Sequence, residues 1–481
     1  MAETVTNYID GEWIEAETGE TFEVRNPADT NDVVATFQQS GAEDAERAIE
    51  AANEAREAWA DTPGPERGAI LNDAAKLLEE RKDELTEALS REEGKTPAEA
   101  APEVQRAIDI FYYYAQKARD YGGRVKQSSV SGRQLSTRRE PLGVAALITP
   151  WNYPIAIPAW KLAPALATGN TVVFKPASLA PNVGRKLIEA LDEAGIPDGV
   201  VNMVTGPGSE VGETFATHDD VHVVSFTGSS SVGHNVYASA TDDEKRVQTE
   251  MGGKNPTVVM PTADVDKAID IVGAGAFGVT GQACTATSRA IVHEEVYDEF
   301  VDGIVDYAES IEIGPGLDGA DMGPQVSESE LESTLEYIKI AEDEGASLET
   351  GGDRPEIDSE GYFVEPTVFS DVDSDMRIAQ EEVFGPVLAV IRVGSYEEAI
   401  EVANGVPYGL SAGIVTRDLS EANRFADDVE AGVVKINEKT TGLELHVPFG
   451  GVKDSSSNTY REQGDAAIDF FTTTKTVYLN Y

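Results

Sequence analysis

Short apolar runs that alternate with amphipathic segments constrain the fold of this chain most strongly. Beyond residue 140, apolar runs rich in β-branched residues cover 144–148, 171–174, 200–204 and 222–226. Helical patterns cover residues 157–167, 184–194 and 210–217 between them. Strands that alternate with helices are typical of βαβ units, because parallel neighbours need a crossover connection. This part of the sequence therefore predicts a parallel sheet.

A second alternating set follows Gly252. Strands are expected at residues 257–260, 290–292, 387–392 and 411–416, with helices at 265–279, 295–311, 329–344 and 396–403. Ahead of both sets, residues 43–116 are rich in Ala, Glu and Leu at helical spacing, which predicts helices at 43–59 and 66–91. The fold class is therefore α/β, with two α/β layers joined by a glycine-bearing turn near residues 250–254.

Two segments stand outside this alternation. Residues 123–138 and 472–479 are rich in Ser, Thr and Val with alternating character, which predicts β-structure. They can pair with each other or with another subunit.

The net charge restricts both the partners and the surroundings of the chain. Its 37 basic and 87 acidic residues leave a formal charge of −50, while 41% of the residues are hydrophobic, as in an ordered domain. Such a surface is typical of high salt, where screening acts over roughly 3 Å at 1 M. Clustered Lys and Arg, which bind nucleic acids, are lacking, so a nucleic-acid partner is not expected.

Localisation and metal binding follow from other features. The start MAETVTNYIDGEW lacks the basic and apolar parts of a signal peptide, and no apolar run reaches the length of a membrane span, so neither secretion nor membrane insertion is expected. A single cysteine excludes an intrachain disulfide, which favours a reducing cytoplasm. With one Cys and five His, of which His218 and His222 share no helical face, no metal site is expected.

The single cysteine, Cys284, lies between an apolar helix and a predicted strand. Its neighbours Gly281, Ala283 and Thr285 are small, so its sulfur is expected to be reachable. A buried structural cysteine and a nucleophile both remain open at this point, because a thiolate needs surroundings that favour its charge.

Two polar residues at strand ends are further candidates. Glu250 ends a strand-like stretch just before Gly252 and Gly253, which allow close approach of backbone or ligand. Asn152 follows the strand at 144–148, at the edge where parallel sheets bind ligands, and its amide could stabilise an oxyanion. A solvated Glu and an ordinary turn Asn would account for the same two residues without any chemistry.

Two other strand ends carry groups suited to phosphates. The stretch FTGSSSVG, residues 226–233, reads as a strand, a Gly/Ser turn and a helix start, where free N–H groups can hold a pyrophosphate. FKPAS, residues 174–178, places Lys175 and Ser178 at a strand end without a carboxylate. This pair suits a phosphorylated ribose better than a free 2′-hydroxyl.

Taken together in chain order, PWNYP, FKPAS, FTGSSSVG, EMGGK, GQACTA, EEVFGPV and HVPFGG resemble the aldehyde dehydrogenase superfamily over essentially the whole chain. The resemblance implies Cys284 as nucleophile, Glu250 as base and Asn152 as oxyanion donor. It further implies NAD(P) contacts by Trp151, Lys175, Ser178, Gly228, Ser229, Glu382 and Phe384, and a substrate contact by Tyr153.

The family fold implies three parts. A Rossmann-like cofactor domain is expected over residues 1–122 and 139–249, and an α/β catalytic domain over 250–440. Residues 123–138 and 452–481 would form a β-flap through which the chain assembles into a homodimer or homotetramer.

The implied reaction oxidises an aldehyde to a carboxylate through a thiohemiacetal and a thioester on Cys284. Many NAD-preferring relatives carry Glu where this chain has Ser178, which predicts that NADP is preferred and NAD possible. The chain also departs from relatives that have Lys, one residue, Ser and Gly near the C-terminus, because here Asp454, Ser455 and Ser456 follow Lys453.

The C-terminal stretches 440–451 and 460–464 resemble the α-ketoglutarate semialdehyde (2,5-dioxopentanoate) dehydrogenases of sugar-acid oxidation. Arg106, on a helix where similar enzymes place an apolar residue facing the substrate funnel, is a candidate partner for a substrate carboxylate, although a surface Arg would fit the same helix. Succinate semialdehyde, lactaldehyde and glycolaldehyde are rival substrates. A catalytically silent structural relative is the rival hypothesis from a different class.

Overall fold

The computed structural model describes residues 3–481, and its first sheet has seven strands. Their order is β11 (Arg246–Glu250), β10 (Val223–Thr227), β7 (Val144–Ile148), β8 (Thr171–Lys175), β9 (Val201–Met203), β1 (Asn7–Ile9) and β2 (Glu12–Ile14). From β11 to β9 all neighbours are parallel, and β1 and β2 add antiparallel strands at the edge. The predicted parallel sheet is therefore confirmed, whereas its two N-terminal edge strands were not predicted.

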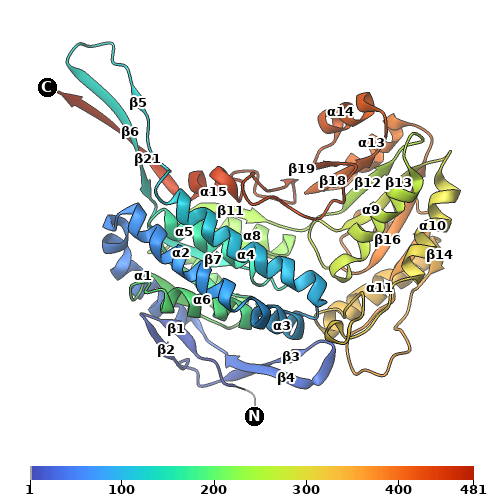
Figure 1. Ribbon diagram of the computed structural model, residues 1–481, viewed down its shortest axis with the longest axis horizontal. Coiled ribbons are helices and arrows are strands. Elements are labelled where there is room, and N and C mark those ends of the chain that lie inside the picture. Colours follow the sequence, from blue (N-terminus) through green and yellow to red (C-terminus); the bar gives the residue numbers. More distant parts are fainter. Residues whose placement is uncertain (1–2) are drawn as a thin grey trace.

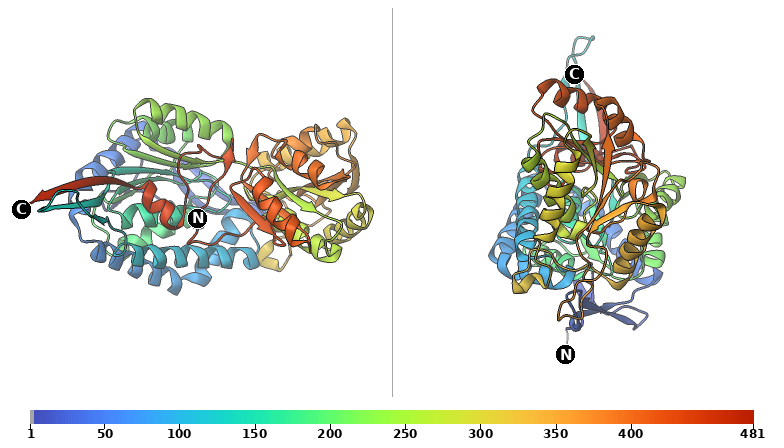
Figure 2. Two further views of the ribbon diagram at one scale, coloured as in Figure 1. Left: turned by 90° about the horizontal axis from the view of Figure 1, so that it is seen from above. Right: turned by 90° about the vertical axis from the view of Figure 1, so that its right-hand side faces the viewer.

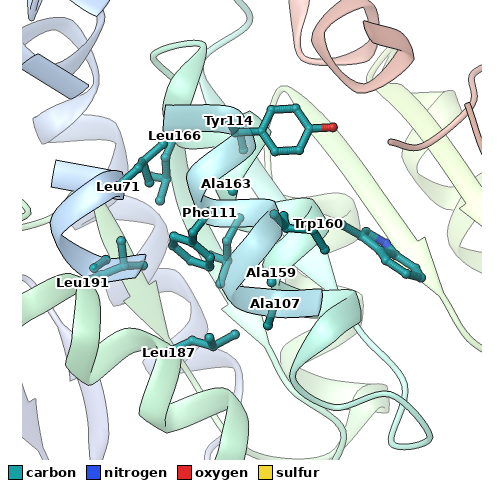
Figure 3. Close-up of a cluster of buried hydrophobic side chains, with 14 of the residues drawn as sticks. Leu71, Ala107, Phe111, Tyr114, Ala159, Trp160, Ala163, Leu166, Leu187 and Leu191 are labelled. Carbon is teal, nitrogen blue, oxygen red and sulfur yellow. The ribbon is translucent and has the colours of Figure 1, made fainter. Parts of the chain in front are cut away.

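Helices cover both faces of this sheet (Figure 1). Alternate strand residues such as Leu147 and Phe174 face α2 (Gly64–Glu80), α4 (Pro97–Lys117), α5 (Ala156–Ala167) and α6 (Asn182–Glu193). Figure 3 shows this core, with Phe111 of α4 between α2, α5 and α6. Ala146 and Val173 face the other way, toward α1 (Ala42–Asp61), α7 (Glu213–Thr217) and α8 (Ser230–Asp242). Strands buried on both faces explain the continuous apolar runs in the sequence.

The second sheet also has seven strands. Their order is β14 (Ser347–Thr350), β15 (Thr367–Ser370), β16 (Val387–Val393), β13 (Thr287–His293), β12 (Asn255–Val259), β18 (Ser411–Val415) and β19 (Val433–Ile436). Only β14 runs antiparallel to its neighbour. Helices α9 (Val265–Phe277) and α10 (Tyr297–Glu309) cover one face. The other is covered by α11 (Glu328–Glu344), α12 (Arg377–Gln380), α13 (Tyr396–Asn404) and α14 (Leu419–Asp428).

The chain passes from one sheet to the other within a few residues, since β11 ends at Glu250 and β12 begins at Asn255. Figure 2 shows the two sheets in two lobes that lie side by side. The fold is therefore the α/β arrangement that the sequence predicts. Among residues 3–481, no helix is long and apolar enough to cross a membrane.

One local prediction was wrong, and one element was missed. The helix expected over residues 66–91 is two helices, α2 and α3 (Lys82–Glu93), which separate at Arg81 because its φ of −101° and ψ of 13° leave the helical region. No Gly or Pro marks this break in the sequence. The N-terminal hairpin of β3 (Thr21–Asn26) and β4 (Asp29–Gln38) was also missed, although its two strands pair over most of their length.

The two segments left over by the sequence pattern pair with each other. Strands β5 (Val125–Lys126), β6 (Arg133–Pro141) and β21 (Thr472–Asn480) form one antiparallel sheet, which projects from the body (Figure 1). Residues 452–471, which were also expected in the β-flap, lie on the body of the molecule. Strand β20 (Val452–Lys453) pairs with β17 (Tyr408–Gly409), and α15 (Gly464–Phe470) packs against α5.

Candidate active site

Cys284 lies in the loop between a 3₁₀ turn, Gly278–Gly281, and β13. It is half-buried and the chain's only free thiol. Burial raises the pKa of the Cys284 thiol, and the charges of Glu382, Glu250 and Glu462 raise it further. The thiol is therefore the resting form, and it must lose its proton before the sulfur can act as a nucleophilic thiolate.

The loop that leads to Cys284 is held in an unusual conformation. Val279 and Thr280 both have φ of 55°, a region that β-branched residues rarely adopt. The Val279 N–H donates to Glu99 of α4 at 2.5 Å, and the Thr280 hydroxyl donates to the Gly323 carbonyl at 3.0 Å. Contacts to two other parts of the chain thus stabilise a strained approach to the cysteine, as is common at functional sites.

Asn152 is buried in the loop after β7 and reaches the cysteine loop. Its side-chain nitrogen donates to the main-chain carbonyl of Gln282 at 2.9 Å, two residues before Cys284. The buried Lys95 ammonium donates to the main-chain carbonyl of Asn152 and pairs with Glu103 at 2.7 Å. The structure therefore brings Asn152 and the Cys284 loop together, and the side chain and the main chain of Asn152 each have a hydrogen-bond partner.

Glu250 ends β11 and is fully buried at the same edge of the sheet. One carboxylate oxygen accepts the Gly451 N–H at 2.9 Å, and the other accepts the Ser456 hydroxyl at 3.3 Å. Burial raises the pKa of Glu250 well above its usual value, and the charge of Glu462 raises it further. A buried carboxyl with a raised pKa is suited to accept a proton near neutral pH.

Two buried groups next to Glu250 were not predicted. Lys161 and Glu462 form an ion pair, and Lys161 also donates to Ser225 at 2.7 Å. Lys161 is the one charged residue of the apolar helix α5, which is buried throughout. A lone Lys in such a helix is the sequence signal that could have pointed to this pair, because a buried charge needs a partner.

Glu382 lies over the glycine turn that follows Glu250. Its carboxylate accepts the Gly253 N–H at 2.8 Å, and burial raises its pKa to about 7. A Cβ atom at Gly252 would lie 1.9 Å from this carboxylate, so the close approach requires glycine there. Phe384 follows with φ of 59°, and its ring meets that of Trp151 edge to face at 5.4 Å.

The carboxyl ends of four parallel strands are in register at one edge. Ile148 pairs with Lys175 and with Phe226, and Thr227 pairs with Glu250. Ligands of open α/β sheets bind at this edge. The residues predicted to contact a cofactor on these strands therefore face the same region as Asn152 and Glu250.

This edge fits an anionic dinucleotide. The Lys175 ammonium is buried and donates only to the Pro176 carbonyl, at 3.2 Å, and burial lowers its pKa to about 8. The Gly228 N–H donates to the Glu250 carbonyl, and α8 starts after Ser229 without a side-chain cap. Within residues 3–481 the buried Ser230 hydroxyl has no hydrogen-bond partner. Phosphate groups would satisfy the Lys175 ammonium, the Ser230 hydroxyl and the uncapped N–H groups at the start of α8, whereas the Gly228 N–H already has a partner.

Ser178 lies in the loop after β8, and its hydroxyl donates to the Gly206 carbonyl at 3.1 Å. Because residue 178 is a serine, this position places no carboxylate beside Lys175. A phosphorylated ribose would therefore meet a cation and a hydroxyl here, without a like charge at position 178.

Arg106 lines an open cavity of about 680 Å³. One wall is a stripe of α4, and the opposite wall is the loop around Leu445; the lining consists of Pro102, Gln105, Arg106, Asp109, Tyr113, Glu444, Leu445 and His446. Tyr153 does not line this cavity but lies under Lys95, whose ammonium is 4.2 Å from its ring centroid. Burial raises the pKa of Tyr153, and the nearby Cys284 makes a smaller contribution. Tyr153 thus lies close to Lys95 and the cysteine, whereas Arg106 lines a cavity whose lining includes none of the other predicted site residues.

The two histidines that lie four residues apart, His218 and His222, each accept a main-chain hydrogen bond. Nδ1 of His218 accepts the Asp220 N–H at 3.1 Å, and Nδ1 of His222 accepts the Val144 N–H at 3.2 Å. Across the described part of the chain, no group of three or more His, Cys, Asp or Glu residues is placed to hold a metal ion.

The half-buried cysteine, the buried carboxyl of raised pKa and the polar ends of the parallel strands thus belong to one candidate site. The chain belongs to the aldehyde dehydrogenase family, whose model matches residues 13–477. It is 64% identical to the α-ketoglutarate semialdehyde dehydrogenase of Haloferax volcanii, covering 100% of both chains. It is 47% identical to the α-ketoglutaric semialdehyde dehydrogenase of Bacillus subtilis, covering 99% of this chain and 98% of that one.

The fold agrees with solved structures of the family. Betaine aldehyde dehydrogenase of Staphylococcus aureus, in complex with NAD⁺, superposes with a TM-score of 0.96 at 35% identity, covering 99% of this chain and 94% of the other. The chain is thus an oxidoreductase that acts on an aldehyde, and the cofactor of its family is NAD(P).

Proposed function

We propose that this enzyme oxidises α-ketoglutarate semialdehyde to α-ketoglutarate, in the degradation of pentoses or sugar acids. The observation that carries the proposal is the unpaired Arg106 in the cavity between α4 and the loop around Leu445. Among residues 3–481 its guanidinium has no ion pair, in a chain with 87 acidic residues against 37 basic ones. The names of the Haloferax and Bacillus relatives support the same substrate.

Arg106 is free although carboxylates lie on the same cavity wall and opposite it. Asp109, one turn along α4, accepts the side-chain nitrogen of Gln105 at 2.8 Å, and Glu444 lies 3.8 Å from His446. A guanidinium left without a carboxylate in such surroundings is suited to bind one from the substrate, with two parallel hydrogen bonds.

In the proposed mechanism, the Cys284 thiol first releases its proton to water, and the resulting thiolate then attacks the aldehyde carbon. The Asn152 amide and the Cys284 N–H would stabilise the oxyanion, each contributing about 3 kcal/mol. NAD(P), when bound, accepts the hydride. Glu250 then removes a proton from the water that hydrolyses the thioester on Cys284, and the carboxylate leaves. The raised pKa of Glu250 suits it to that proton transfer.

The cofactor is proposed to be NADP in preference to NAD. Lys175 and Ser178 would hold the 2′-phosphate, and Gly228, Ser229 and the start of α8 would hold the pyrophosphate. The remaining contacts, at the nicotinamide end, are assigned to Trp151, Glu382 and Phe384.

The surroundings are proposed to be a reducing cytoplasm at high salt. A lone nucleophilic thiol must stay reduced, and a charge of −50 is tolerated where counterions screen it. The flap of β5, β6 and β21 is proposed to join copies into a homodimer or homotetramer. It projects from the body and exposes Tyr478 and Leu479.

A substrate panel at high salt tests the proposal. The five-carbon acidic semialdehyde should have the highest kcat/KM, above succinate semialdehyde, lactaldehyde, glycolaldehyde and the uncharged pentanal. Arg106→Ala should raise KM for the acidic substrate at least tenfold and change KM for pentanal much less, because a charged hydrogen-bonded pair is lost. Equal KM values for the variant and the wild type would contradict the anchor. No cofactor reduction with any aldehyde would contradict the function.

A further inference from the structure

Gln105 connects two charged residues at the wall of the Arg106 cavity. Lys82, the first residue of α3, donates from its ammonium to the side-chain oxygen of Gln105 at 2.7 Å. The side-chain nitrogen of Gln105 donates to Asp109 at 2.8 Å. The amide is therefore oriented from both ends, because its oxygen faces a cation and its nitrogen faces an anion.

The position of Asp109 on α4 would allow it to pair with Arg106. Asp109 lies three residues after Arg106 on α4, a spacing at which opposite charges on a helix pair readily. Both residues line the same cavity, yet no ion pair joins them in residues 3–481. The Asp109 carboxylate is instead engaged one turn back, with Gln105.

We propose that Lys82 and Gln105 are positioning residues that hold Asp109 away from Arg106, so that the guanidinium stays free for the carboxylate of an acidic aldehyde. This inference rests on the proposed function, since it concerns how the anchor of that substrate is kept open. Lys82 does not line the cavity, and its effect must therefore pass through Gln105. This relay, the two hydrogen bonds from Lys82 to Gln105 and from Gln105 to Asp109, determines selectivity for charged over uncharged aldehydes.

The test measures one ratio: KM for α-ketoglutarate semialdehyde divided by KM for pentanal, with the full-length enzyme at a fixed high salt concentration. At 1 M salt screening acts over about 3 Å, which suppresses the long-range effect of removing the Lys82 charge but not a direct ion pair. In Lys82→Met and in Gln105→Leu, Asp109 is released to pair with Arg106. The ratio should rise roughly twofold to fivefold, the range expected for a partly exposed pair.

Asp109→Asn supplies the matched control. Alone, it should leave the ratio close to the wild-type value, because Asp109 is already held away from Arg106. Combined with Gln105→Leu, it should return the ratio to that of Asp109→Asn alone, a rescue that a merely structural role of Gln105 would not produce.

The other outcomes distinguish the positioning role of Lys82 and Gln105 from the anchor role of Arg106 and from the choice of substrate. If Arg106→Ala raises the ratio while Lys82→Met and Gln105→Leu leave it unchanged, the positioning role is wrong and the anchor stands. If the double variant keeps the raised ratio, Gln105 acts on the substrate directly and not through Asp109, which overturns the inference. If Arg106→Ala itself has no effect, the proposed acidic substrate fails and the relay with it.

Discussion

The side-chain nitrogen of Asn152 lies 2.9 Å from the main-chain oxygen of Gln282 and so joins the first sheet's ligand edge to the loop of Cys284. Asn152 follows β7 of the first sheet, whereas Gln282 precedes β13 of the second. The proposed oxyanion donor and the nucleophile therefore come from different lobes and meet through this contact.

Replacing Asn152 should impair catalysis more than folding. Asn152→Ala removes one oxyanion donor and is expected to lower kcat about 100-fold to 1,000-fold. Lys95 still donates to the main-chain carbonyl at position 152, so the loop should keep its place. Steady-state kinetics and a thermal melt of the same preparation check both points. A variant with unchanged kcat would show that Asn152 is only a turn residue.

The Ser456 hydroxyl should lower the pKa of the proposed base, Glu250. This hydroxyl donates to Glu250, which favours the charged carboxylate, so Ser456→Ala should raise the pKa of Glu250 further. Glu250 acts deprotonated, and activity is lost as pH falls through its pKa. The acidic limb of kcat should therefore move to higher pH by roughly half a unit. Ser457→Ala is the control, because Ser457 contacts Thr249 and not Glu250. Identical pH profiles for both variants would contradict this role.

Sequence patterns predicted the two parallel sheets well because strands buried on both faces are continuous apolar runs, such as Val172 and Val173 in β8. The separation of α2 from α3 at Arg81 could not be predicted, since no Gly or Pro marks it in the sequence. Cys284, Glu250 and Asn152 were identified by motif resemblance. Their joint approach depends on contacts between distant segments, such as Glu250 with Gly451, that no local pattern encodes.

Position 178 should control the choice of cofactor. Ser178→Glu places a carboxylate where the ribose phosphate is expected, and like charges repel, so kcat/KM for NADP should fall at least tenfold while NAD is spared. Ser178→Ala is the control, with a much smaller change. In the wild type, burial lowers the pKa of Lys175 to about 8, so its charge is lost as pH rises through that value. KM for NADP should then rise between pH 7 and 9, and KM for NAD should rise less.

The flap should be required for assembly but not for folding. Tyr478 and Leu479 on β21 are 63% and 52% exposed. In the proposed oligomer, a second copy of the chain would bury both side chains. Tyr478→Asp combined with Leu479→Asp should give monomers with a native circular dichroism spectrum. Leu419→Asp is the control, since Leu419 is exposed on α14 in the other lobe. Light scattering after gel filtration gives the masses. Unchanged mass in the flap variant would exclude this interface.

A trapped thioester on Cys284 gives the sharpest test of the proposed covalent step. Glu250→Gln should leave attack and hydride transfer intact but slow hydrolysis by about 100-fold to 10,000-fold. Mixed with α-ketoglutarate semialdehyde and NADP and quenched in acid, it should show one burst of NADPH per site. Intact-mass and peptide analysis should show one α-ketoglutaryl group on the peptide of Cys284. A full burst without any acyl group on Cys284 would show that the covalent intermediate does not form on this residue.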